Sequence, residues 1–108
     1  MATTMISARS EMVTVVNVFT VSPDHQQALV ELLERATAEV MCVRRGFVSA
    51  NIHKSLDGLR VLNYAQWTSH ETYEAMLADR FAQSHLHAAA ELGISESHLY
   101  RVESVYHV

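Results

Sequence analysis

Four segments of the chain carry the residue pattern of β-strands. Residues 13–21 (VTVVNVFTV) are almost all β-branched or apolar, and residues 47–55 and 59–67 contain similar runs, which favours strands in all three. Residues 99–108 alternate apolar and polar positions, so we expect a fourth strand there. The Leu-Asp-Gly segment at 56–58 predicts a short hairpin turn that pairs the second strand with the third.

A long helix is predicted between the first two strands, because apolar residues recur there at intervals of three and four. Ser22 and Pro23 stand at its start, where serine favours the N-cap and proline the first helical position. The apolar spacing continues to Val43, and Gly46 follows as a stop. We therefore expect a helix over residues 23–43.

Two further helices are predicted after the third strand. Thr68 and Glu71 have the spacing of a capping box, which indicates that a helix begins there. Asp79 and Arg80 interrupt the apolar pattern, and a last helix should continue to Gly93. The apolar side of this last helix is expected to consist of Phe81, Leu86, Ala89 and Ala90.

The order of strand, helix, two strands, helical region and strand is that of the split β-α-β arrangement. The chain is thus predicted to be an α+β protein of ferredoxin-like fold, a four-stranded antiparallel sheet with its helices on one face. Residues 12–108 would form this single domain, and residues 1–11 a flexible N-terminal segment.

Helices on one face leave the other face of the sheet uncovered. Strand alternation places six large side chains there: Val16, Val18, Val48, Ile52, Leu62 and Tyr64. An apolar patch of this size is unusual on a monomer, and two sheets packed face to face about a twofold axis would bury it. The pattern predicts a homodimer through the sheet face, a dimeric α+β barrel.

Composition narrows the classes of partner. The 108 residues carry a net charge of −4, with acidic and basic residues mixed along the chain, which argues against nucleic acid or a membrane surface as a partner. No apolar run reaches the roughly 18 residues of a membrane span, and residues 1–12 lack the apolar core of a secretion signal. The single Cys42 allows no internal disulfide. A cytoplasmic protein is expected.

Two asparagines fall on strand faces that should meet the core. Asn63 shares its face with Trp67, and Asn17 shares its face with Phe19. Burying an amide without a partner costs roughly 1–3 kcal/mol, whereas polar groups fixed in an apolar wall are typical of a small-molecule pocket. The alternative is that Asn63 is a core residue bonded to neighbouring backbone and that Trp67 only packs.

Three motifs carry a resemblance to a known family. The strand Asn-Tyr-Ala-Gln-Trp at 63–67, the strand Val-Asn-Val-Phe-Thr-Val at 16–21 and the Gly-Phe helix exit at 46–47 resemble the antibiotic biosynthesis monooxygenase family of small dimeric α+β barrels. The resemblance covers roughly residues 13–105. It is closest to the cofactor-independent oxygenases that convert tricyclic anthrone-type polyketides into quinones.

The resemblance implies catalytic roles for Asn17, Asn63 and Trp67, which match pocket residues of these oxygenases. The two amides would donate hydrogen bonds to a developing oxyanion, and Trp67 would hold the aromatic ring. The implied partners are a small aromatic substrate and O₂.

Substrate binding is expected from three more residues. Tyr73 matches a pocket tyrosine of some relatives, and Phe19 shares the face of Asn17. His87 stands where one subgroup of anthrone oxygenases has an arginine, and it would be a group that titrates near neutrality.

The expected chemistry uses no cofactor and no metal. His85 and His87 are two positions apart on a predicted helix, so they point to different sides and cannot hold one ion together. The chain has three glycines, at 46, 58 and 93, and none belongs to a glycine-rich nucleotide loop.

Two other functions fit the same fold. A haem-degrading relative would ligate iron through a histidine near His85, but such proteins keep a second tryptophan where this chain has Met76. A non-catalytic, ligand-binding or stress-responsive dimeric barrel is the other alternative.

Overall fold

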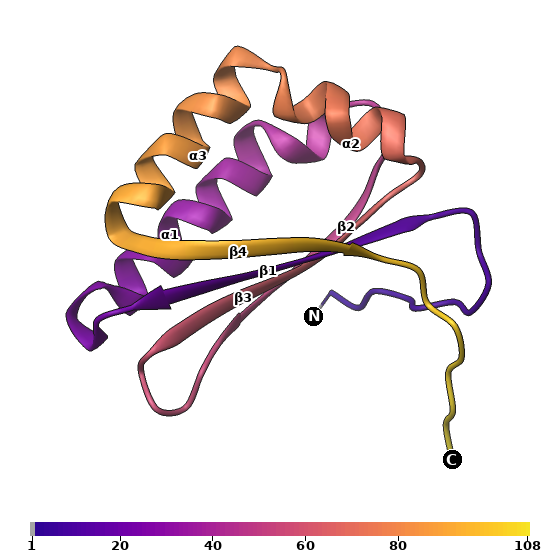
Figure 1. Ribbon diagram of the computed structural model, residues 1–108, viewed down its shortest axis with the longest axis horizontal. Coiled ribbons are helices and arrows are strands. Elements are labelled where there is room, and N and C mark those ends of the chain that lie inside the picture. The colour runs from indigo at the N-terminus through magenta and orange to yellow at the C-terminus, as the bar shows by residue number, and fades with distance from the viewer. Residues whose placement is uncertain (1) are drawn as a thin grey trace.

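The computed structural model describes residues 2–108, so Met1 of the predicted N-terminal segment lies outside the described residues. In chain order the elements are β1 (Val13–Val21), α1 (Pro23–Glu39), the short 3₁₀ helix η1 (Met41–Val43), β2 (Phe47–Lys54), β3 (Arg60–Trp67), α2 (His70–Leu77), α3 (Arg80–Leu92) and β4 (Gly93–Tyr100). The strands form one antiparallel sheet in the order β2-β3-β1-β4, and the helices cover one of its faces (Figure 1). The predicted ferredoxin-like fold is confirmed.

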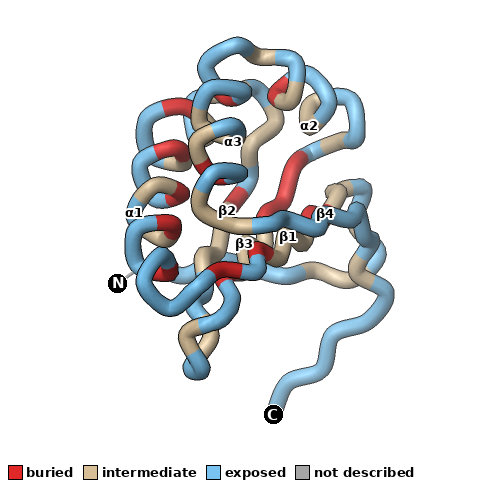
Figure 2. Tube along the Cα trace, turned by 60° about the vertical axis from the view of Figure 1, so that its left-hand side comes forward, coloured by how far each residue is buried: buried red, intermediate tan, exposed pale blue. Residues whose placement is uncertain are grey.

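The core lies between α1, α2 and α3 and the covered face of the sheet. Figure 2 shows buried residues where α1 faces the sheet, whereas β4 and the C-terminal residues are exposed. None of the helices within residues 2–108 is both long and apolar enough to cross a membrane.

The first helix is shorter than predicted. It ends at Glu39, and the chain tightens into η1, where the N–H of Arg44 donates to the carbonyl of Met41 at 3.0 Å. The apolar period continues through this turn, so the sequence pattern did not distinguish a 3₁₀ turn from a further α-helical turn. Gly46 then has a φ of +88°, a conformation that favours glycine.

The cap of α2 lies one residue later than predicted. The Ser69 hydroxyl accepts from the N–H of Thr72 at 3.1 Å, and the Thr72 hydroxyl accepts from the N–H of Ser69 at 3.3 Å. The N–H of Thr68, the predicted cap, donates to the carbonyl of Gly46 at 2.8 Å, which places Thr68 beside the start of β2 and before the helix.

The predicted break between the last two helices is confirmed, and Asp79 forms it. Its carboxylate accepts from the N–H of Ala82 at 2.9 Å and pairs with Arg44 at 3.1 Å. The N–H of Ala82, followed by the Arg44 guanidinium, holds the pKa of Asp79 below its usual value. This contact joins the α2–α3 junction to the segment after η1.

The last strand was predicted in the wrong place. It runs from Gly93 to Tyr100 and pairs with residues 14–21 of β1, whereas residues 101–108 form no helix or strand. Gly93 allows the strand to begin directly after α3. It pairs with Val21, and a Cβ at this position would lie 2.6 Å from Val21 Cγ1, so only a residue without a side chain fits there. The strand is an edge strand with exposed side chains. Its sequence therefore lacks the alternation of apolar and polar residues by which the other strands were predicted.

Ile52 lies on the helix-covered face, not on the open face as predicted. It stands opposite Asn63 and packs on the core, because the register shifts between Phe47 and Ser49. An extra residue of this kind changes the alternation of side chains along the rest of the strand. Phe81 and Ala90 were also misplaced: both are exposed, and Ala82 and Ala89 are the buried residues of α3.

Residues 2–12 contain no helix or strand and run along the open face of the sheet (Figure 1). The Thr4 hydroxyl donates to the Asn51 carboxamide oxygen at 2.6 Å, and the N–H of Arg9 donates to the carbonyl of Val102 at 2.9 Å.

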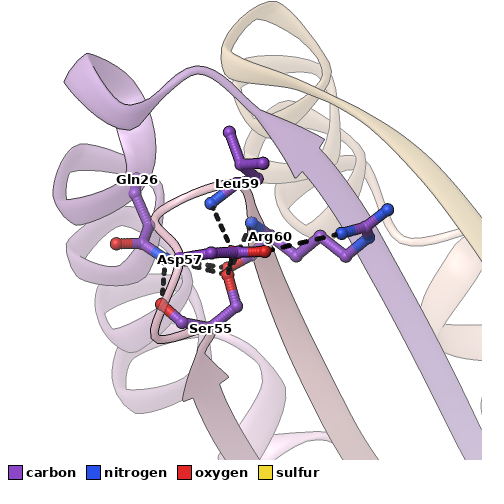
Figure 3. A network of polar contacts seen from close by, with 5 residues as sticks. All are labelled: Gln26, Ser55, Asp57, Leu59 and Arg60. Carbon is purple, nitrogen blue, oxygen red and sulfur yellow. Dashed lines mark hydrogen bonds and ion pairs between the residues drawn. The ribbon is translucent and has the colours of Figure 1, made fainter.

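A polar network joins the β2–β3 hairpin to α1 (Figure 3). The buried Gln26 amide donates to the carbonyls of Ser55 and Arg60, each at 3.0 Å. Asp57 accepts from the Ser55 hydroxyl at 2.7 Å and from the N–H of Leu59 at 3.0 Å. These two donors hold the pKa of Asp57 below its usual value. One side chain of α1 therefore fixes the position of the hairpin that carries β3.

Replacing Gln26 with alanine is expected to lower the free energy of unfolding by about 1–3 kcal/mol, because two hairpin carbonyls lose a buried donor. Urea denaturation measures the change. Gln27→Ala is the control: Gln27 is exposed, so this change should stay within about 0.5 kcal/mol. Equal effects of the two substitutions would contradict the anchoring role of Gln26.

Candidate active site

A cavity of about 80 Å³ lies between the covered face of the sheet and the helices. Val15, Phe19 and Ala65 contribute to its sheet wall, and Leu33, Met76 and Leu86 to its helical wall. The wall is mainly apolar, so the few polar groups that reach it determine what the cavity can do.

Asn17 and Asn63 face each other across β1 and β3 and both line this cavity. Each carboxamide oxygen is buried and has no hydrogen-bond partner among the described residues. In this structure neighbouring backbone therefore does not satisfy the Asn63 carboxamide oxygen. Because a carboxamide has both a carbonyl oxygen and N–H donors, each side chain can bond to a polar group placed in the cavity.

The asparagine pair lies between two separate parts of the core. One buried cluster includes Val15, Ala65 and Trp67, and the other includes Phe19 and Val61. Asn17 lies between Val15 and Phe19 on β1, and Asn63 between Val61 and Ala65 on β3. Two polar residues at the middle of the sheet thus interrupt the apolar packing where the cavity lies.

Trp67 forms one end of the cavity wall within a group of aromatic rings. It is 2% exposed, and its ring lies 5.5 Å from that of Phe47 at 87° and 6.3 Å from that of Tyr73 at 60°. Edge contacts of this kind hold an aromatic ring in one orientation. All three rings line the cavity, which offers an aromatic substrate a fixed surface.

Of the six predicted site residues, five line the cavity: Asn17, Phe19, Asn63, Trp67 and Tyr73. His87 does not; it is exposed, and His85 lines the cavity in its place. The two positions differ by about 200° around a helix, so only one of them can face the sheet.

The His85 ring has a defined orientation. Its Nδ1 lies 2.9 Å from the backbone carbonyl of Phe81, one helical turn earlier. A carbonyl oxygen only accepts, so Nδ1 carries the proton of this bond and the neutral ring leaves Nε2 unprotonated.

Ser97 is a cavity residue that the sequence analysis missed. It stands opposite Asn17 on β4 and extends the polar row of β1 and β3 to a third strand. The prediction failed because β4 was expected to start at Leu99. The helical wall also includes Met41 and Leu77, which the sequence analysis did not assign to the site.

Among residues 2–108, no three histidine, cysteine, aspartate or glutamate side chains are grouped closely enough to hold a metal ion.

The chain matches a known protein family. The family model described as antibiotic biosynthesis monooxygenase matches residues 12–92. Tetracenomycin-F1 monooxygenase of Streptomyces glaucescens is 45% identical over 80 residues, which span 74% of this chain and 71% of the relative.

Two solved structures share the fold over nearly the whole chain. SnoaB, a cofactor-independent oxygenase from Streptomyces nogalater, superposes with a TM-score of 0.76 at 27% identity, over 89% of this chain and 97% of SnoaB. The monooxygenase from the gene ActVA-Orf6 of Streptomyces coelicolor, in complex with nanaomycin D, superposes with a TM-score of 0.79 at 30% identity, over 93% and 94% of the two chains.

Because its oxygen has no partner, the Asn63 carboxamide should add nothing to stability. Asn63→Ala is expected to leave the free energy of unfolding within about 0.5 kcal/mol, or to raise it. Val61→Ala, on the same strand and face and fully buried, is the control and should lower it by roughly 2 kcal/mol. Chemical denaturation compares the two variants. Equal losses would mean that Asn63 is a structural core residue.

Proposed function

This chain belongs to the antibiotic biosynthesis monooxygenase family and is a monooxygenase, and on that premise we propose that it oxidises an anthrone-type polyketide to a quinone with O₂ and no cofactor. The observation that carries the proposal is the pair of asparagines in an apolar cavity beside Trp67, whose carboxamide oxygens have no hydrogen-bond partner among the described residues. The names of two relatives support the substrate class and the cofactor independence: tetracenomycin F1 monooxygenase and the cofactor-independent oxygenase SnoaB.

The reaction needs electrons only from its substrate. An anthrone has a methylene group flanked by aromatic rings, and loss of one proton gives a delocalised anion. The anion passes one electron to O₂, and the two radicals combine to form a carbon–oxygen bond. The resulting hydroperoxide loses water and becomes the quinone, so the CH₂ group and O₂ are converted into a C=O group and water.

The residues of the cavity fit these steps. The N–H groups of Asn17 and Asn63 would donate to the oxygen on which the negative charge of the anion gathers, in a wall that excludes water. Trp67, Phe19 and Tyr73 would hold the ring system. The amides lie on paired strands of the sheet, so their positions are set before the substrate arrives.

The volume of the cavity implies that its helical wall moves when substrate binds. Sites for ligands of this size start at roughly 300 Å³, whereas this cavity encloses about 80 Å³. Met41 and Met76 line the helical wall, and methionine is the apolar side chain that adapts most easily to a new shape. We propose that these side chains, and not the strand residues, make room for the rings.

We also propose that the protein is a homodimer through the open face of the sheet. Val18, Leu62 and Tyr64 lie there along a groove of about 360 Å³, whose lining also includes His53, Lys54, Ser55 and Arg60. A second sheet packed on this face would cover the groove and form the barrel.

The haem-degrading alternative gains one observation from the structure, since His85 lines the cavity. Two observations count against it. The chain has Met76 where haem-degrading relatives keep a second tryptophan, and the 45% identical relative is named tetracenomycin-F1 monooxygenase. Titration with haemin tests it: a Soret shift that disappears in His85→Ala would favour haem binding.

Protein dialysed against EDTA is expected to consume O₂ when offered a model anthrone such as dithranol, with equimolar quinone formation and no added reductant. Asn63→Ala should lower kcat by on the order of 10²-fold if its amide binds the developing oxyanion. An oxygen electrode and absorbance of the quinone measure the two rates.

The control for this experiment is Gln27→Ala, which is remote from the cavity and should keep the kcat of the unaltered protein. Activity that is lost on dialysis and restored by iron or copper would overturn the cofactor-independent proposal.

The dimer is tested by sedimentation. The unaltered protein should sediment as a dimer, and Leu62→Lys, which places a charge in the interface, should lose the dimer and aggregate or unfold. Leu56→Lys is the control, because Leu56 is fully exposed in the β2–β3 turn and its substitution should leave the dimer intact. An unaltered protein that sediments as a monomer contradicts the barrel.

A further inference from the structure

We propose that His85 is the catalytic base of this enzyme: its Nε2 takes the proton from the substrate and later returns it to the departing oxygen. The inference rests on the proposed function and adds the group that moves the proton.

The first reason is the orientation of the ring. The bond from Nδ1 to the Phe81 carbonyl at 2.9 Å leaves Nε2 as the nitrogen with a free lone pair in neutral imidazole. The residue lines the cavity from α3, so a proton acceptor of known tautomer is presented to any molecule bound there. A bond to a carbonyl one turn earlier also limits rotation of the ring.

The second reason is the division of groups between the two walls. On the sheet wall lie Asn17, Asn63 and Ser97, which are neutral hydrogen-bonding groups that do not take up a proton near neutral pH. On the helical wall lies His85, and no carboxylate or amine lines the cavity within residues 2–108. Histidine is the side chain whose ordinary titration range includes neutral pH, which suits a group that must accept and return a proton in one turnover.

In each turnover, Nε2 of His85 takes up and releases a proton twice. In the first, a C–H bond of the substrate breaks, the proton moves to Nε2 and the electron pair stays on the substrate; after O₂ has added, the imidazolium protonates the peroxide. In the second, Nε2 takes the remaining proton from the same carbon as the O–O bond breaks and the C=O bond forms. The hydroxide that leaves accepts this proton and departs as water, so the ring ends neutral.

His87 provides a matched control two residues away. It is on the same helix, is the same residue type and lies outside the cavity on the exposed side. A change at His87 therefore tests the loss of a histidine from α3 without the loss of a group from the cavity.

The test compares His85→Gln with His87→Gln. His85→Gln should lower kcat by about 10²–10⁴-fold, while dithranol still quenches the fluorescence of the single Trp67 at similar concentrations. His87→Gln should stay within about twofold of the unaltered protein. In His85→Ala, added imidazole should restore turnover in proportion to its concentration, because it can occupy the vacated volume and accept the proton.

A second measurement isolates the proton transfer from the reaction with O₂. Under nitrogen, the unaltered protein and His87→Gln should convert bound dithranol to its coloured anion, and His85→Gln should not. Anion formation without oxygen uptake in air would overturn the proposed function and leave the base assignment standing. Equal anion formation by His85→Gln, unchanged kcat in that variant, or no rescue of His85→Ala by imidazole would overturn the assignment.

Discussion

The structure depends on one unfavourable arrangement, two carboxamide groups that face each other across paired strands in the middle of an apolar core. Neither oxygen of Asn17 or Asn63 has a partner among the described residues, although a partner would be worth roughly 1–3 kcal/mol at each site. Under the function proposed above, a bound molecule would supply the missing hydrogen bonds. The division of the core into two clusters and the cavity between them follow from the same pair.

The two walls of the cavity differ in rigidity. The sheet wall is held by the strand ladders, and the hairpin that carries β3 is anchored to α1 through Gln26. The helical wall is joined at its α2–α3 junction by the Arg44–Asp79 pair and otherwise consists mainly of flexible apolar side chains. Rigid donors opposite an adaptable wall allow precise placement of one polar edge of a substrate while the bulk of its rings varies.

The two faces of the single sheet differ in character. Because side chains alternate along each strand, the residues next to Asn17 and Asn63 point to the open face: Val16, Val18, Leu62 and Tyr64. Any substitution that shifts the register by one residue would therefore exchange the polar pair of the cavity with the apolar surface opposite it. The site and the open face constrain each other through the register of β1 and β3.

The sequence by itself determined the order of the elements, the covered face of the sheet and the placement of Asn17, Asn63 and Trp67, because β1 and β3 pair without a bulge and side chains alternate with a period of two along such strands. It did not determine which histidine enters the cavity, since a helix rotates by about 100° per residue and its phase depends on where packing sets α3. His85 and not His87 faces the sheet for this reason. The start of β4 and the position of Ser97 depend on backbone pairing with β1. The side chains of an exposed edge strand show no pattern from which this pairing could be predicted. The bulge at Phe47 and Ser49 reversed the expected side of Ile52 in the same way, because the alternation of a strand is local and its register is a property of the assembled sheet.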